Sequence, residues 1–99
     1  MTIEINKFYF DSLYNRARQG FYECIRLKEN EFLRKEIPGP LESIILRGTN
    51  IKIVFSEDII DAYVLNICLT LFAANKEVGK YTYCENEGGS PVDDSLVFY

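Results

Sequence analysis

The C-terminal stretch Gly79–Tyr99, GKYTYCENEGGSPVDDSLVFY, decides the fold that we expect for this 99-residue chain. Two β-prone runs within it, Lys80–Cys84 and Ser95–Tyr99, alternate their side chains with a period of two, as strands do. The segment between them, Asn86–Asp94, contains two adjacent glycines with permissive dihedrals, and Pro91, which cannot donate a ladder hydrogen bond. The stretch therefore predicts a C-terminal β-hairpin with an acidic connection.

An N-terminal helical segment is expected over Asn6–Lys35, because apolar residues recur there at intervals of three and four. These residues are Phe10, Leu13, Tyr14, Ala17, Phe21, Cys24 and Ile25. Gly20 weakens the middle of the segment by about 1 kcal/mol relative to Ala. It leaves two other readings open: the segment divides into two helices, or Phe21–Leu27 forms a strand.

The sequence Ile37–Pro40 breaks this segment, because a residue before proline disfavours the helical conformation. After the break, Leu41–Arg47 fits a short helix that ends at Gly48. A hairpin that pairs Ser43–Leu46 with Ile51–Phe55 fits the same residues equally. Both interpretations stay open at this point.

A central strand is expected at Asn50–Phe55, which is β-branched and apolar. Ser56 and the carboxylates of Glu57 and Asp58 then resemble a helix start, since they suit the free amides and the positive end of a helix dipole. We therefore expect a helix over Glu57–Asn75 that is apolar on most sides and buried in the core. Its polar residues and its length argue against a membrane span.

These elements predict one α+β domain over residues 1–99. It contains an N-terminal helical segment, a central strand, a long buried helix and a C-terminal β-hairpin that forms a small antiparallel sheet. A chain of this length suits one compact domain and not two.

The composition disfavours catalysis. The chain has no histidine, which removes the commonest general base and metal ligand, and it has no nucleotide-binding glycine loop. The three cysteines, Cys24, Cys68 and Cys84, are too far apart for a metal or redox motif. We expect reduced thiols in a cytoplasmic protein, no metal, no cofactor and no enzymatic activity.

Charge is distributed unevenly along the chain. Residues 1–55 carry nine Lys or Arg against seven Asp or Glu, a net of +2, whereas residues 56–99 carry two against eight, a net of −6. This asymmetry bears on partners: the acidic half repels nucleic acid and attracts a basic surface.

Two acidic groups and one aromatic group are candidates for partner contact. The hairpin carboxylates lack the spacing of a calcium loop and the cleft of a glycosidase, so they form either a contact surface or a solvated loop. At the start of the predicted helix, the dipole explains Glu57 and Asp58 but not Asp61. An exposed tyrosine beside the acids would anchor a partner, although core packing is the default for the rings. The candidate contact residues are Asp93, Asp94, Glu85, Glu87, Asp61 and Tyr83.

The segment Lys76–Tyr99 resembles the C-terminal ends of small bacterial immunity proteins, which neutralise polymorphic or contact-dependent toxins. The similar features are the Gly-Lys-Tyr-Thr-Tyr strand, the acidic glycine-containing turn and the terminus Val92-Asp93-Asp94-Ser95-Leu96-Val97. Lys80 and the inserted Ser90-Pro91 depart from that pattern. The resemblance implies a cytosolic protein that binds one cognate toxin and covers its active site, in many cases the basic cleft of a nuclease.

Two other functions compete with this expectation. One is a phage or mobile-element protein that inhibits a host factor through the same acidic face. The other is a structural subunit that associates with itself through its Tyr- and Leu-rich surfaces.

Overall fold

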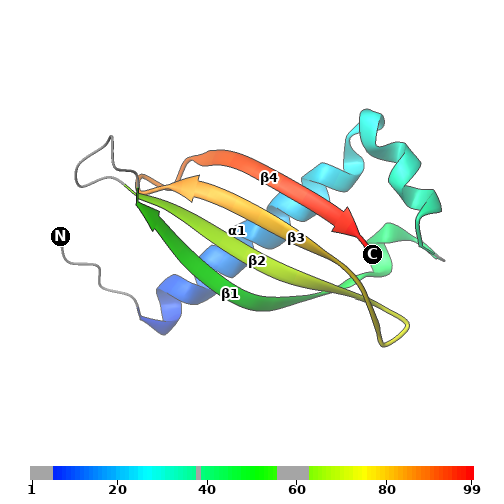
Figure 1. Ribbon diagram of the computed structural model, residues 1–99, viewed down its shortest axis with the longest axis horizontal. Helices are drawn as coiled ribbons and strands as arrows, with labels where there is room; N and C mark the ends of the chain where they lie inside the picture. Colours follow the sequence, from blue (N-terminus) through cyan, green and yellow to red (C-terminus); the bar gives the residue numbers. More distant parts are fainter. Residues whose placement is uncertain (1–5, 38, 56–62) are drawn as a thin grey trace.

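The computed structural model describes residues 6–37, 39–55 and 63–99 and has two layers, a sheet and one long helix (Figure 1). The helical elements are α1 (Lys7–Arg26) and two 3₁₀ segments, η1 (Lys28–Lys35) and η2 (Leu41–Ser43). The strands are β1 (Ile45–Phe55), β2 (Tyr63–Ala73), β3 (Lys76–Asn86) and β4 (Pro91–Phe98). They form one antiparallel sheet in the order β1-β2-β3-β4. The α+β class is confirmed.

Helix α1 runs without interruption through Gly20, so the readings that divide it or place a strand at Phe21–Leu27 are wrong. The side chain of Asn6 caps it by accepting a 2.9 Å hydrogen bond from the amide of Tyr9. One side chain per turn is fully buried against the sheet. These buried residues are Leu13, Ala17, Phe21 and Ile25. The α-helix ends at Arg26 rather than Lys35, and the residues after it form η1, which buries no side chain.

The strand expected at Asn50–Phe55 is confirmed, although it lies at the edge of the sheet, whereas the helix Leu41–Arg47 and the hairpin of Ser43–Leu46 with Ile51–Phe55 are both wrong. A single eleven-residue strand, Ile45–Phe55, follows the three-residue turn η2. A β-bulge between Gly48 and Asn50 shifts the β1–β2 register, and Gly48 lies within the strand rather than at the end of a helix.

The helix expected over Glu57–Asn75 is wrong for its main part, because Tyr63–Ala73 forms strand β2. Residues 56–62 lie outside the described residues, so the predicted helix start at Glu57 and Asp58 does too. The physical reason is that β2 is a central strand, hydrogen-bonded on both edges. Such a strand is apolar almost throughout, and its sequence cannot be told from a buried helix by periodicity alone.

The C-terminal hairpin consists of β3 and β4, joined by residues 87–90, and both strands are longer than the sequence predicts. Pro91 begins β4 instead of lying within the connection, which is a position that proline tolerates. We call the sheet face that packs on α1 the core face and the opposite one the open face. Tyr81 and Tyr83 point to the core face and are buried there with Leu65 and Ile67 of β2.

In the part of the chain that the structure describes, no helix combines the length and hydrophobicity required to cross a membrane.

Candidate protein-binding groove

A groove of about 620 Å³ separates the C-terminal half of α1 from the start of β4. In Figure 1, α1 passes behind the sheet and emerges beyond β4, so its last turns extend past the sheet edge. We call this hollow the α1–β4 groove. It is lined by Arg16, Gln19, Gly20, Glu23 and Cys24 of α1, by Leu27 directly after the helix, by Tyr81 and Tyr83 of β3, and by Gly89, Pro91, Val92, Asp93 and Asp94.

Gly20 lets the helix approach the sheet at the floor of the groove. A Cβ atom at this position would lie 2.7 Å from Tyr81 Oη and 3.1 Å from Tyr83 Cδ1. Any larger residue would push the helix away from the two rings. Close packing against Tyr81 and Tyr83 therefore explains why a glycine occupies position 20 despite its low helix propensity. The helix stays continuous because the residues on either side of Gly20 bury apolar side chains against the sheet.

Tyr81 links the floor of the groove to its acidic rim. Its ring is fully buried and lies edge-on to Phe21, with centroids 5.7 Å apart. Its hydroxyl donates a 2.8 Å hydrogen bond to Asp94 Oδ2. Burial, followed by the hydrogen bond and charge of Asp94, raises the pKa of Tyr81 well above its ordinary value. The phenol therefore stays protonated at neutral pH and orients the carboxylate of Asp94.

Arg16 and Glu85 form an ion pair beside the floor. Arg16 donates from Nη2 to Glu85 Oε1 at 2.7 Å and from Nε to Oε2 at 3.0 Å, a bidentate arrangement. Its Nη1 also donates to Ser12 Oγ at 2.6 Å. The hydrogen bond with Glu85 is the main reason why the pKa of Arg16 is raised. Arg16, the one cation among the described residues that line the groove, is thus already neutralised.

The structure separates the six residues that the sequence suggested for partner contact. Asp93 and Asp94 are exposed and line the groove. Glu87 is exposed in the turn 87–90 but does not line the groove. Glu85 is 1% exposed and paired with Arg16, so it is not accessible to a partner. Tyr83 is 7% exposed and belongs to the floor.

The sixth residue, Asp61, lies outside the described residues. Of the candidates among the described residues, the accessible acids are therefore Asp93, Asp94 and Glu87.

Sequence reasoning missed Glu23, which faces the groove from α1 together with Gln19 and Leu27. Gln19 and Glu23 are spaced by four and share one face of α1, so the helical pattern contained a signal for them, and Leu27 follows directly after the helix. Nothing in the sequence indicated that this face would lie across from Asp93 and Asp94.

The groove is acidic and partly apolar. Glu23 and Asp94 direct carboxylates toward the groove, whereas Asp93 lines it from β4 with its side chain on the opposite face of the strand; none of the three is in a salt bridge with a Lys or Arg of the described residues. Burial and the nearby Asp94 raise the pKa of the Cys24 thiol, which disfavours the nucleophilic thiolate. Among residues 6–37, 39–55 and 63–99, no group of three or more Cys, Asp or Glu is placed to hold a metal ion. The arrangement suits a cationic group better than it suits bond-making chemistry.

Comparisons of this chain with protein families, with curated proteins and with solved structures found no match.

Proposed function

We propose that this chain is a non-catalytic inhibitor of the immunity-protein type, which binds a cognate bacterial toxin in the cytoplasm through the α1–β4 groove. The observation that carries the proposal is the position of Asp93 and Asp94. Exposed Asp94 of β4 lies across the groove from Glu23 of α1, and exposed Asp93 adds a second carboxylate to the same edge on the opposite face of the sheet. The C-terminal resemblance to immunity proteins supports the same conclusion.

The physical chemistry of the groove fits a basic protein surface. Uncompensated carboxylates in a concave site attract a positively charged partner and raise the rate of encounter. Leu27, 49% exposed, and Val92, 56% exposed, add apolar area at the rim that a partner could bury. A nuclease with a basic substrate cleft has the complementary charge, and the carboxylates would occupy positions that phosphates otherwise take. The free cysteines are compatible with a reducing compartment.

The first test is a growth assay. The product of the gene adjacent to that of this protein is expressed alone and together with the chain. We expect growth arrest in the first case, recovery in the second and co-purification of the two proteins. A neighbouring product that is harmless, or that does not bind the chain, would contradict the proposed function.

The second test assigns the surface. In Glu23→Lys/Asp93→Lys, we expect association with the captured partner to slow by about tenfold or more at low salt, with a weaker salt dependence. Asp94 is left unchanged because its loss would also remove the Tyr81 hydrogen bond. Glu36→Lys/Glu77→Lys is the matched control, since it makes the same charge change at exposed positions outside the groove lining. Equal effects of both variants would refute the assignment to the groove.

A further inference from the structure

Strand β4 is an edge of the sheet. The strand order ends with β4, and in the described part of the chain no other strand pairs with its outer side. The outer edge of such a strand presents main-chain N–H and C=O groups that can pair with an additional strand. The α1–β4 groove lies beside this edge, because Pro91, Val92, Asp93 and Asp94 form one of its walls.

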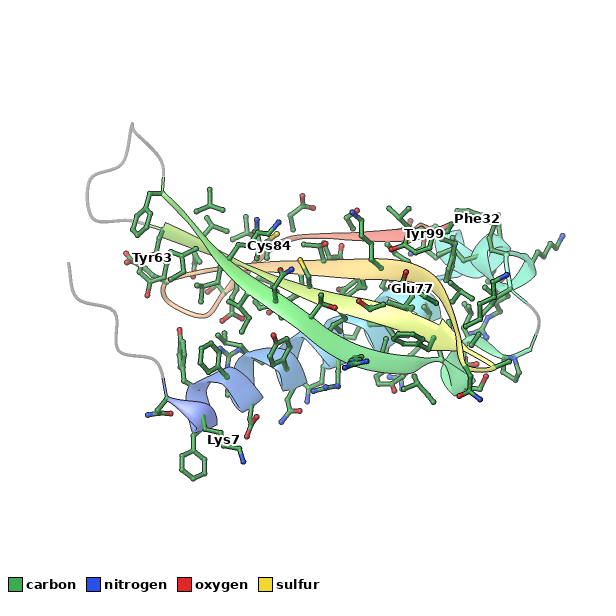
Figure 2. The ribbon with its side chains drawn as sticks, turned by 60° about the horizontal axis from the view of Figure 1, so that its bottom comes forward. Lys7, Phe32, Tyr63, Glu77, Cys84 and Tyr99 are labelled. Carbon is green, nitrogen blue, oxygen red and sulfur yellow. The ribbon has the colours of Figure 1, made fainter. Side chains whose placement is uncertain are left out.

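The two adjacent aspartates of β4 point to opposite faces of the sheet. Asp94 is opposite Tyr83 in the β3–β4 register and accepts a hydrogen bond from buried Tyr81, which places its side chain on the core face. Asp93 is opposite Cys84, whose side chain points away from α1, so Asp93 lies on the open face. The sheet seen from another side, with Cys84 labelled, is drawn in Figure 2.

We propose that β4 accepts an extended segment of the partner as an additional strand, and that this segment carries two consecutive Lys or Arg residues. The inference rests on the proposed function, and it names the chemistry of the bound element. Consecutive side chains of the added strand alternate between the faces. One basic side chain then enters the groove between Asp94 and Glu23, and the next lies beside Asp93 on the open face.

Charge explains why this edge selects a basic strand. A second copy of β4 would bring Asp93 and Asp94 close to the same carboxylates, and like charges opposite each other destabilise a strand pair. The other edge of the sheet, β1, has Arg47 and Lys52 and no acidic residue, so it repels the same basic segment. Pro91 has no amide hydrogen, which restricts pairing to Val92–Phe98, and within this stretch the Asp94 amide donates to Asp93 Oδ1 at 2.9 Å, a contact that an added strand replaces.

The experiment uses short capped peptides as probes and the nitrogen-15-labelled protein. The first peptide has Lys-Arg at the centre of alternating Thr and Val. A second peptide of the same composition separates Lys and Arg by one residue, so that both would point to one face. Two further versions of the first peptide carry N-methyl groups on alternate amides, in one phase or the other. Only one of these phases blocks the edge that faces β4.

We expect the Lys-Arg peptide to bind about fivefold or more tightly than the peptide with separated charges, since one of the two ionic contacts is lost in the latter. Amide shifts should concentrate on Val92–Phe98. One N-methylated version should lose binding and the other should retain it. Asp93→Asn/Asp94→Asn should weaken binding, and Glu36→Gln/Glu77→Gln should not.

Four outcomes would each overturn the strand-addition proposal. They are equal binding of the two charge arrangements, retained binding of both N-methylated peptides, amide shifts centred on β1, and no binding of any peptide at millimolar concentration. These outcomes are distinguishable from failure of the proposed function. If the protein captures the partner but does not bind the peptides, the proposed inhibitor function is still supported and only strand addition is refuted. If the peptides bind as expected but the product of the neighbouring gene does not, strand addition at β4 is supported and the proposed toxin partner is refuted.

Discussion

Replacement of Arg16 by Met should destabilise this protein more than any other substitution of a charged residue that we consider. Glu85 is 1% exposed and accepts two hydrogen bonds from the guanidinium. Without Arg16, the carboxylate is buried with no compensating charge, which costs about 3–5 kcal/mol in fully buried pairs. Because the Arg16 side chain is 36% exposed, water can partly replace it, and we expect the lower end, about 3 kcal/mol.

Substitution of the other partner, Glu85, should reduce the free energy of unfolding by less. In Glu85→Leu the guanidinium can turn toward water, and we expect a loss of about 1 kcal/mol in the free energy of unfolding. The double variant Arg16→Met/Glu85→Leu removes both charges and should also lie within about 1 kcal/mol of the original protein. The coupling energy between the two positions is then about 3 kcal/mol.

Urea unfolding of the four proteins, followed by circular dichroism, measures this cycle. Arg34→Met is the control, because it breaks the exposed ion pair with Glu42 and should cause no measurable loss. A cost below about 1 kcal/mol for Arg16→Met, together with additive single effects within about 0.5 kcal/mol, would refute the reasoning. Glu85 would then be accessible to water, and its exclusion from the contact surface would be unjustified.

Three further predictions concern packing and titration. Gly79→Ala should cost about 2 kcal/mol or more by urea unfolding, because the new Cβ would clash with the backbone oxygen of Val97. Gly88→Ala, in the open turn, is the control, and equal effects would contradict the close approach of Gly79 to Val97. The Arg34 guanidinium lowers the pKa of Glu42 from 4.5 to about 2, and because the pair is exposed, its contribution to stability is small, present above pH 4.5 and lost as pH falls toward 2. Arg34→Met should move the carboxyl midpoint in an NMR titration back toward 4.5. An unshifted midpoint would exclude the pair in solution. The pKa of Tyr81 is raised above 10.0, so its stabilising effect is complete below pH 10 and is lost as pH rises beyond it, and one tyrosine should resist ionisation in an absorbance titration until the protein unfolds. Ionisation of all tyrosines in the folded protein would contradict the burial of Tyr81.

Local patterns in the sequence determined part of the fold. Helix α1 was predictable because one side chain per turn is apolar, and the hairpin was predictable because alternating runs flank a turn rich in glycine. The sequence placed the adjacent acids Asp93 and Asp94 in the connection Asn86–Asp94, whereas in the structure they belong to β4. The contrast between the +2 and −6 halves of the chain likewise identifies the acidic region, because net charge depends on composition alone.

Only the tertiary structure decided the state of Tyr63–Ala73, the environment of Glu85 and the composition of the groove. An apolar run such as that of β2 satisfies a helix and a central strand equally, and the pairing with β1 and β3 selects the strand. In the sequence, Glu85 is one of several hairpin acids, whereas in the fold Arg16, 69 residues away in the chain, holds it in the core. Glu23 meets Asp93 and Asp94 because α1 extends past the edge of β4. The physical reason is common to all three. Periodicity and turn chemistry act between neighbours in sequence, whereas burial, ion pairing and concavity depend on which distant segments pack together.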